Sequence, residues 1–482
     1  MPSKKIVGLG SGSLYFFGEY GSLALLPLAE GLAESEIVLY DIDAEKNRRM
    51  AAMGQRLADE AGTRMKVRAA ADLDDALDGA DFAVSSIGGS GADVGRDVYY
   101  SYYHQADVHI PARYGIRQIV GDTGGPAGMM MALRSIPVYL DICRRMERRC
   151  PRAILFNHSN PMAALMRAIH KYSSIAAIGV CHGVQSGIYA VAEMLNLPAD
   201  ELDCLWIGTN HYYWFTRIAH KGQDLTQKVM RLAAEQDVPA GSAICQRLSA
   251  AYGHRIVYRS DDHIIEFYPY LAQGGNADKL PPELAESAMR HGFDPSSPMP
   301  VRSGPDPEAR AAFLKQFQGL LDKTQLAKFL RNAFTGVSGL RRPDAAGQLP
   351  KPVVGEGTIS LMETLAAGQK AICIANIANQ GAIPNLPADA EVEIQAVVDS
   401  CGARPVYMGP APRVLKGILE KRFAWHELVA DAAAKGDRNA ALQALLTDEM
   451  AILPDQAKAM LDELLEASRP LLPQFFGKEN AS

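Results

Sequence analysis

Short apolar runs alternate with longer amphipathic stretches from residue 4 to about residue 180. Runs rich in Val and Ile are typical of strands buried on both faces, whereas apolar positions that recur every three to four residues are typical of helices. The longest helical patterns cover residues 44–61 and 129–149. Strands alternating with helices predict an α/β fold, a Rossmann-like doubly wound parallel sheet. The expected strands are residues 6–9, 36–40, 66–68, 82–86, 153–156 and 176–180.

The second part of the chain lacks this alternation. Residues 276–307 and 339–357 contain several Pro and Gly residues and little apolar periodicity, which predicts two long loops. Ala, Leu and charged residues recur at helical spacing over residues 414–472, which predicts a helical end. We therefore expect two domains, a Rossmann-like domain at residues 1–198 and an α+β, helix-rich domain at residues 199–482.

Composition narrows the class of protein without giving a function. The 482 residues are 48% hydrophobic, and 55 acidic side chains against 49 basic ones give a formal charge of −6. Because phosphate binding needs clustered Lys and Arg, this balance and the lack of a basic tract argue against nucleic acid as the main partner. No apolar run approaches the about 18 residues of a membrane span, and the first residues enter a strand pattern directly. We expect a cytoplasmic protein without a membrane segment.

A glycine-rich turn, GLGSGS at residues 8–13, follows the first expected strand and opens a helix. Backbone N–H groups in such a turn can hold a pyrophosphate, and glycine is needed because a Cβ would block the phosphates. Ser13 stands where the third glycine of the usual fingerprint would be. The second expected strand ends at Asp41, whose carboxylate would meet a ribose 2′-hydroxyl and favour NAD over NADP, while Asp43 fits a helix N-cap better. The candidate NAD contacts are Gly8, Gly10, Ser11, Gly12 and Asp41.

Candidate metal ligands follow the later strands, where an open α/β sheet presents its ligand crevice. Cys181 and His182 come after the sixth strand, and His211 lies in the next apolar stretch. A thiolate and an imidazole are good ligands for a divalent transition metal. A lone Cys or His is more often a buried core residue, so this alternative stays open. The seven cysteines are scattered and odd in number, so we expect free thiols.

Several motifs occur along nearly the whole chain in a specific order, at residues 8–11, 39–43, 80–82 with 88–89, 114–116, 121–126, 160–161, 181–182, 210–211 and 376–387. In this order the sequence resembles the NAD- and manganese-dependent glycosidases of glycoside hydrolase family 4. The resemblance implies NAD and Mn²⁺, or another divalent transition metal, as cofactors. It implies Cys181 and His211 as metal ligands and Asn160 as a substrate contact.

The residue after the cysteine tracks substrate class in this family. His182 stands there, whereas the phosphosugar hydrolases carry Asp or Asn. The resemblance therefore implies a small-molecule substrate that is an unphosphorylated, α-linked hexoside or uronide. His182 would contact this substrate and act as general acid toward the leaving oxygen.

The family also needs a base for the proton at sugar C2, a Tyr or an Asp from a segment after the metal histidine. Here that segment is residues 259–270, in which Phe267 stands where a Glu-Tyr pair is expected in the α-galactosidase branch. We predict Asp261 first and Tyr268 second, and Asp262 and Tyr270 remain open. The alternative for Asp261 is a cap or turn.

The implied reaction oxidises the sugar at C3, removes the C2 proton, eliminates the aglycone, adds water and returns the hydride. An NAD-dependent 2-hydroxyacid dehydrogenase of the lactate/malate type is the alternative enzyme, but no His, Asp and Arg triplet is evident and the Cys–His pair would have no use. A non-catalytic NAD-binding sensor is a third reading. We further expect a homodimer or homotetramer, whereas the sugar and aglycone do not follow from the sequence.

Overall fold

The structure is a computed structural model. It describes residues 3–12, 32–60, 62–88, 101–235, 241–272, 307–322, 358–399, 402–448, 450 and 452–477. The expected loops at 276–307 and 339–357 lie almost entirely outside these residues. None of the helices in the described ranges is long and apolar enough to cross a bilayer.

Six parallel strands form the centre of the molecule, in the order β3-β2-β1-β4-β5-β6. This order is that of a doubly wound dinucleotide-binding sheet, so the predicted Rossmann-like fold is confirmed. Each strand lies within one or two residues of its predicted position. The strands are β1 Lys5–Leu9, β2 Glu36–Tyr40, β3 Lys66–Ala69, β4 Phe82–Ser85, β5 Ile154–Asn157 and β6 Ala176–Gly179.

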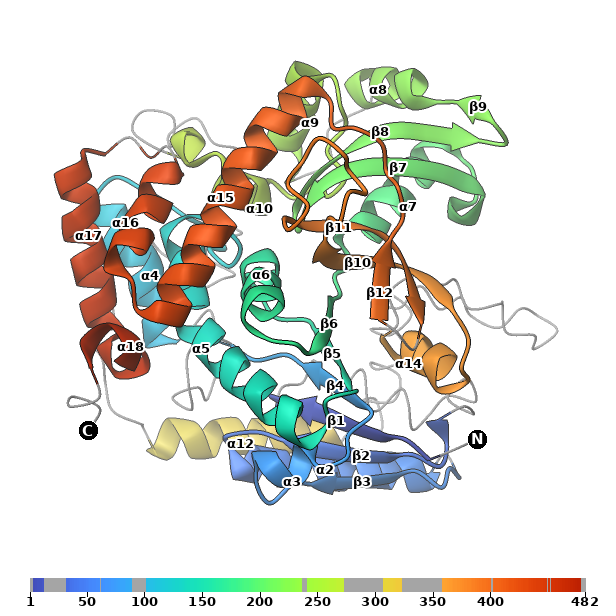
Figure 1. The fold of residues 1–482 in the computed structure, drawn as a ribbon, viewed down its shortest axis with the longest axis vertical. Helices are drawn as coiled ribbons and strands as arrows, with labels where there is room; N and C mark the ends of the chain where they lie inside the picture. The colour runs from blue at the N-terminus through green and yellow to red at the C-terminus, as the bar shows by residue number, and fades with distance from the viewer. Residues whose placement is uncertain are drawn as a thin grey trace.

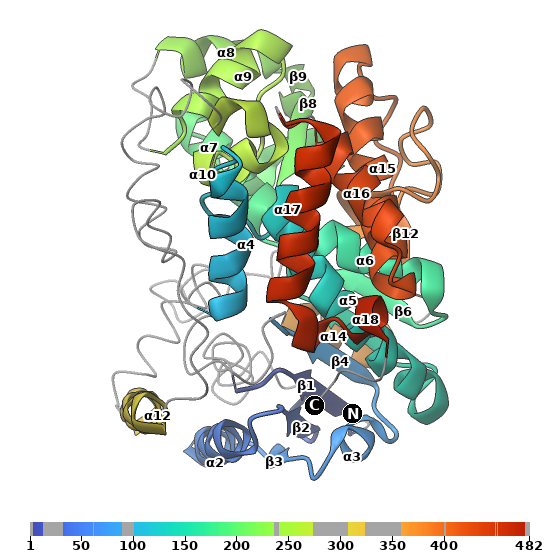
Figure 2. The same cartoon turned by 90° about the vertical axis from the view of Figure 1, so that its left-hand side faces the viewer.

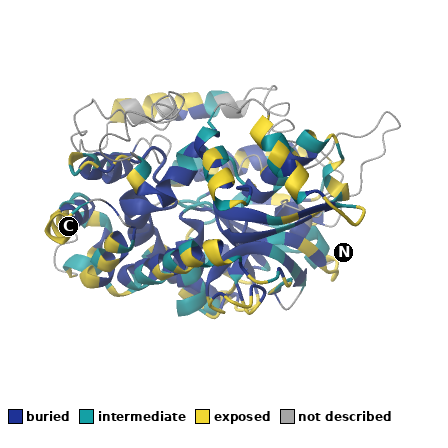
Figure 3. Ribbon diagram, turned by 90° about the horizontal axis from the view of Figure 1, so that it is seen from above, coloured by how far each residue is buried: buried dark blue, intermediate teal, exposed yellow. Residues whose placement is uncertain are grey.

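Alternate side chains of these strands enter two different hydrophobic cores. Val7 of β1 and Val38 of β2 pack with α5 and the C-terminal helices on one face. Ile6 and Ile37 pack with α2 and α14 on the other face. Successive side chains of a strand point to opposite faces, so continuous apolar runs are needed when helices cover both. Figure 3 shows the resulting buried centre, with exposed residues mainly on the outer helices and loops.

Helices between the strands provide these layers. They are α2 Ala44–Glu60, α3 Leu73–Leu77, α4 Tyr102–Arg113, α5 Gly125–Arg149, α6 Met162–Tyr172 and α7 Gly183–Leu195, with α12 Pro307–Asp322 and α14 Thr358–Ala366 from later in the chain. The helices predicted at 44–61 and 129–149 correspond to α2 and α5. Figure 1 shows α12 lying beside α2, and the two helices are in contact.

Three antiparallel strands from late in the chain extend the sheet beyond β6. They are β10 Ala371–Ala378, β11 Glu391–Asp399 and β12 Gly402–Pro405, and β10 pairs with β6 through Asn376 and Gly179. The sequence analysis did not anticipate these strands. The predicted boundary at residue 198 falls between α7 and the short helix η3 Ala199–Glu201, yet the sheet is continuous across both parts. The assignment of two domains stays a prediction.

A smaller antiparallel sheet, β7-β8-β9, carries the segment that follows α7. The strands β7 Leu202–Thr209 and β8 Tyr212–His220 form a hairpin whose turn is residues 210–211, and β9 is Gln223–Asp224. The helices α8 Thr226–Glu235, α9 Ala243–Tyr252 and α10 Asp261–Ile264 follow, with short helices η4 Ile265–Phe267 and η5 Pro269–Ala272. Side chains of this unit share a core with β11 and α15.

The predicted helical end is present as α15 Arg413–Lys435, α16 Arg438–Thr447, α17 Pro454–Ala467 and α18 Pro473–Phe476, with η7 Arg469–Leu471 before α18. Figure 2 shows α17 running beside α4, and the two helices are in contact. The C-terminal helices thus pack onto the first part of the chain.

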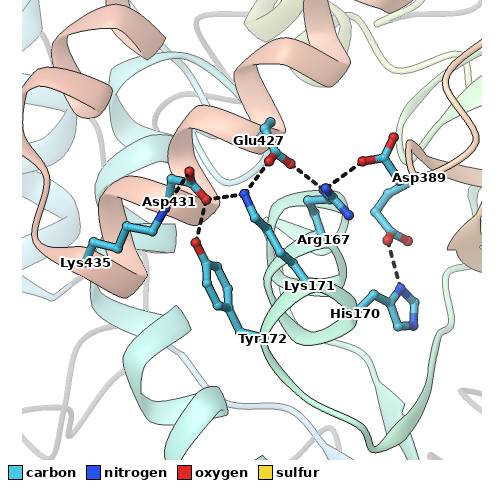
Figure 4. Close-up of polar contacts among 9 residues, drawn as sticks. Arg167, His170, Lys171, Tyr172, Asp389, Glu427, Asp431 and Lys435 are labelled. Atoms are coloured by element: carbon cyan, nitrogen blue, oxygen red, sulfur yellow. Dashed lines mark hydrogen bonds and ion pairs between the residues drawn. The ribbon is translucent and has the colours of Figure 1, made fainter.

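Ion pairs fix α6 against α15 (Figure 4). Arg167 Nε donates to Glu427 Oε2 at 2.5 Å, and its Nη2 donates to Asp389 at 2.7 Å. Lys171 contacts both Glu427 and Asp431, and the Asp431 pKa is held well below its usual range by the hydrogen bonds from Lys171, Tyr172 and Lys435 despite burial. Because α6 begins directly after Asn160-Pro161, this network also positions a predicted substrate contact.

Candidate active site

The glycine-rich turn lies at the carboxyl end of β1, beside the ends of β2 and β4. Gly10 has φ 81°, and a Cβ there would lie 2.5 Å from the carbonyl oxygen of Ser86. Ser11 is buried, and its hydroxyl donates to Asn47 Oδ1 at 2.8 Å. Gly8 is a buried residue of β1, and Ser13 lies outside the described residues. The turn therefore has the close backbone packing that a pyrophosphate-binding turn requires.

Asp41 stands where the prediction placed it, at the end of β2 and next to this turn. Its Oδ2 accepts the Gly12 N–H at 2.9 Å and its Oδ1 accepts the Asp43 N–H at 2.7 Å. Partial burial raises the Asp41 pKa, and these two backbone N–H groups oppose the shift. A Cβ at Gly12 would lie 2.9 Å from Asp41 Oδ2, so glycine permits the approach of turn and carboxylate. The residues present fit the phosphate and ribose of a dinucleotide.

The two predicted metal ligands are brought together from different sheets. Cys181 follows β6 and precedes α7, whereas His211 occupies the turn of the β7–β8 hairpin with φ 61°. Cys181 Sγ lies 3.5 Å from His211 Nε2. Sulfur and nitrogen ligands of one tetrahedral zinc ion, with bonds of about 2.3 and 2.0 Å, are roughly 3.5 Å apart. The spacing fits two donors to one divalent cation.

Asp122 and His263 extend this pair to a cluster. The ligand atoms of Asp122, His211 and His263 all lie within 4.8 Å of one another. Thr123 Oγ1 lies 3.0 Å from His211 Nδ1 and donates to Asp122 Oδ1 at 2.6 Å. With Nδ1 engaged in this way, His211 Nε2 faces Cys181, which is the arrangement expected of an oriented metal ligand. Neither Asp122 nor His263 was predicted from the sequence to have a role.

Buried charges in the cluster strongly perturb each other. Burial alone would raise the Asp122 pKa, but the charge of His263 and the hydrogen bonds from Thr123 and Asn160 hold it below its usual range. Burial alone would lower the His263 pKa, but Glu266 and Asp122 raise it to about 9. Burial and the charge of His263 lower the His211 pKa to about 3. His211 is therefore a neutral imidazole, the form that binds a metal, next to an ionised carboxylate.

Glu266 holds the loop that carries Asp122. Its Oε2 accepts the N–H groups of Thr123 and Gly124, each at 2.9 Å. Its Oε1 lies 3.6 Å from His263 Nδ1. Burial raises the Glu266 pKa, and His263 opposes this shift. A carboxylate on η4 thus ties the Asp122 loop and His263 to one place.

Asn160, His182 and Tyr258 surround this cluster. Asn160 Nδ2 donates to Asp122 Oδ2 at 2.9 Å, which places the predicted substrate contact beside the cluster. His182 is the N-cap residue of α7, and desolvation together with the charge of His263 lowers its pKa. The Tyr258 ring centroid lies 5.2 Å from that of His211, 6.0 Å from His182 and 5.5 Å from His263. Tyr258 therefore packs directly against the cluster.

The structure places Asp261, the first choice for the base, in a different environment. Asp261 is 0% exposed, and its two carboxylate oxygens accept the N–H groups of Ile244 and Cys245 at 2.9 Å. These amides open α9, so this geometry matches the alternative reading of a helix cap.

The other base candidates differ in how near they lie to the cluster. Tyr268 is buried among Tyr212, Tyr252 and Tyr270, and its pKa is raised mainly by burial. Tyr270 is 43% exposed. Asp262 is close enough for its charge to raise the pKa values of His263 and Tyr258.

The sequence contained weak signals for the residues that were missed. Asp122 stood in the motif at 121–126, and His263 stood in the segment searched for the base. Tyr258 lies one residue before that segment. Its approach to the cluster depends on the main chain at 255–257 running alongside β8, with Val257 N–H donating to the Tyr213 carbonyl at 3.0 Å. This pairing has no local sequence pattern.

Known glycosidases are similar to this protein over nearly its whole chain. An α-galactosidase of Bacillus subtilis (strain 168) is 26% identical, over 98% of this chain and 100% of its own. An α-galacturonidase of Lachnoclostridium phytofermentans is 29% identical, over 98% and 97% of the two chains. A solved 6-phospho-α-glucosidase from gut microorganisms, in complex with NAD and glucose-6-phosphate, has 21% identity, a TM-score of 0.74 and coverage of 98% and 100%.

The family itself is decided by two family models. The model described as family 4 glycosyl hydrolase matches residues 5–197. The model of the C-terminal domain of the same family matches residues 206–451. The dehydrogenase and sensor alternatives find no support in these matches. The chain belongs to family 4 of the glycosyl hydrolases, and it is an NAD- and divalent-metal-dependent glycoside hydrolase.

Proposed function

We propose that this enzyme hydrolyses unphosphorylated, α-linked hexosides or uronides through oxidation at C3, loss of the C2 proton, elimination of the aglycone and addition of water. The observation that carries the proposal is the cluster of Cys181, His211, Asp122 and His263, with Asn160 and Tyr258 beside it. His182 after the cysteine and the relatives named for α-galactosides and α-galacturonides support the substrate class.

Cys181 and His211 would hold the divalent cation, and Asp122 is within reach as a further donor. His263 also lies within reach, but its ring would have to lose a proton before it could bind the cation. The turn at Gly10 and Gly12, with Asp41, would hold NAD. When bound, NAD would accept and return the hydride of the sugar, and the cation would stabilise negative charge on the oxygen at C3.

Three side chains of this chain have roles at the sugar. Asn160 would orient the substrate, because its amide is already aligned by Asp122. His182 would donate a proton to the leaving oxygen, although burial and the charge of His263 lower its pKa and so reduce the protonated fraction at neutral pH. We assign the C2 base to Tyr258. Burial and the negative charges of Cys181, Asp262 and Asp122 raise the Tyr258 pKa, and a cation held by Cys181 and Asp122 would oppose that shift.

None of the six cysteines in the described residues forms a disulfide, which supports a reducing compartment, so we assign the enzyme to the cytoplasm. A homodimer or homotetramer remains our expectation. Light scattering of the purified protein tests it, and a monomer at micromolar concentration would contradict it.

The decisive experiment is hydrolysis of aryl α-glycosides and α-glycuronides in D₂O with NAD, Mn²⁺ and a reductant. Elimination requires removal of the C2 proton, so the product sugar should carry deuterium at C2. A two-carboxylate glycosidase never breaks this bond, and a dehydrogenase would accumulate NADH with product. Product without C2 deuterium, combined with no primary isotope effect for C2-deuterated substrate, would exclude the elimination route.

Tyr258→Phe tests the base. We expect the rate to fall by about 10²–10⁴, as for loss of a positioned base, with NAD and Mn²⁺ affinity retained. Tyr268→Phe is the matched control, because Tyr268 also packs against aromatic side chains but lies away from the cluster. This variant should leave the rate largely unchanged. The assignment fails if the control loses the rate and Tyr258→Phe does not.

A further inference from the structure

Glu393 is a buried carboxylate that contacts the turn carrying a metal ligand. It lies on β11, is 0% exposed, and its Oε2 accepts the Asn210 side-chain N–H at 2.8 Å. Its backbone carbonyl accepts the Trp206 indole N–H at 2.7 Å. One residue of β11 is therefore bonded both to β7 and to the hairpin turn that ends in His211.

That turn needs external support because of its backbone conformation. His211 has φ 61°, a left-handed conformation that is unfavourable for a residue with a side chain. The turn has only the two residues Asn210 and His211 between Thr209 and Tyr212. Besides the contact of His211 with Cys181, the turn is held by Asn210 to Glu393 on one side and by His211 Nδ1 to Thr123 Oγ1 on the other. Loss of either would let the imidazole change direction.

The same carboxylate is connected to the strand that leads to Cys181. Asn376 lies on β10 directly opposite Glu393 of β11, near enough for its side-chain amide to oppose the rise of the Glu393 pKa. Asn376 pairs with Gly179, the last residue of β6, and its Nδ2 lies 3.5 Å from the Gly179 carbonyl oxygen. A Cβ at Gly179 would lie 2.8 Å from the Asn376 Cβ, so the two strands are in close contact here. Cys181 follows only two residues later.

The charge on Glu393 is costly at this place. Burial raises the Glu393 pKa to about 7, although hydrogen bonds from Asn210 and Asn376 oppose the shift. Within the described part of the chain no Lys, Arg or His forms an ion pair with it. Burying a carboxylate without a paired cation is unfavourable for folding, so packing alone does not account for a glutamate here.

We propose that Glu393 is a positioning residue of the metal site, which holds the Asn210–His211 turn so that His211 faces Cys181. The proposal rests on metal binding by Cys181 and His211 as proposed above. Groups that orient a metal ligand from behind change metal affinity by about 10–100-fold when they are removed. Glu393 exerts such an effect through the side chain of Asn210 and, by way of Asn376, on the end of β6.

The test is titration of the purified full-length enzyme with Mn²⁺ alone, with free Mn²⁺ followed by electron paramagnetic resonance. Glu393→Leu keeps a buried side chain of similar size but removes the acceptor, so we expect about 10–100-fold weaker binding. Glu393→Gln keeps an acceptor for Asn210 and should restore most of the affinity. Asn210→Ala removes the same hydrogen bond from the side of the hairpin turn, should give a similar loss, and is available if Glu393→Leu does not fold.

Glu391 is the matched control on the same strand. It is equally buried, but its Oε1 contacts His170 at 2.8 Å, away from the cluster. Glu391→Leu should lower thermal stability and leave Mn²⁺ affinity unchanged. Equal losses of affinity in Glu391→Leu and Glu393→Leu, or unchanged affinity in Glu393→Leu and Asn210→Ala, would overturn the proposal.

Cys181→Ser separates this inference from the proposed function. If Cys181→Ser loses Mn²⁺ binding while Glu393→Leu and Asn210→Ala do not, the positioning role alone is wrong. If Cys181→Ser binds Mn²⁺ as tightly as the unmodified enzyme, the metal assignment itself is wrong, and the role of Glu393 is overturned with it.

Discussion

Asp261→Asn should destabilise the enzyme while leaving its chemistry nearly intact. The Asp261 carboxylate is 0% exposed and accepts the N–H groups of Ile244 and Cys245, which open α9. Asparagine has the same shape but only one acceptor oxygen, so one of these amides would face an NH₂ group instead.

The expected loss follows from the number of bonds. A hydrogen bond to a charged group contributes about 1.5–3 kcal/mol, and removal of a helix N-cap costs about 0.5–2 kcal/mol. Asp261→Asn replaces one of two charge-assisted bonds with an amide clash. We therefore expect the free energy of unfolding to fall by about 1.5–3 kcal/mol.

Urea unfolding followed by circular dichroism measures this loss of stability. The catalytic rate is measured as kcat at a temperature well below the unfolding transition, where the variant is folded. Asp262→Asn is the control, because that carboxylate is not the cap of α9. A folded Asp261→Asn enzyme with unchanged stability and a rate lowered by about 10²–10⁴ would refute the capping role and return Asp261 to the position of C2 base.

Three further predictions concern other parts of the molecule. Burial lowers the His170 pKa, but the Glu391 carboxylate outweighs it and raises the pKa. The His170–Glu391 pair therefore stabilises the folded enzyme fully below about pH 6.5, and this contribution is lost as pH rises through the folded-state pKa of His170. The stability difference between unmodified enzyme and His170→Gln, measured by urea unfolding, should thus shrink with rising pH, and a growing difference would contradict it. Asp41→Ala should reduce the preference for NADH over NADPH in fluorescence titrations, whereas an unchanged ratio would show that the carboxylate does not meet the ribose. Gly183→Ala places a Cβ 1.9 Å from the hydroxyl of the buried Tyr213, so overpacking should cost about 1–3 kcal/mol in thermal unfolding.

The sequence predicted those features whose signals are local. The apolar run at β1 must be buried on both faces, and Ile6 and Val7 enter opposite cores. The glycine-rich turn and Asp41 follow β1 and β2 directly, so their proximity is dictated by parallel pairing of the two strands. Cys181 likewise follows a strand, so its position at the carboxyl edge of the sheet follows from the strand pattern alone.

Features that depend on distant segments could not be predicted in this way. Nothing in the run of residues at β10 shows that it pairs with β6 in an antiparallel sense, because its apolar pattern suits many edges. Asp261 and Tyr258 are separated by only three positions, yet one caps α9 and the other packs on His211. Their different roles depend on where α9 begins and on the pairing of residues 255–257 with β8. Neither feature can be predicted from the types of the residues.

The metal cluster is built from residues of both family segments. Asp122 and Cys181 come from the first segment, whereas His211 and His263 come from the second. A cation held by such a set would bond to both segments at once, so its binding free energy would stabilise their association and not either one alone. The sheet supports the same coupling, because β10 closes the edge of β6 two residues before Cys181. A change that weakens the packing of the second segment on the first should therefore also disturb the geometry of the metal cluster.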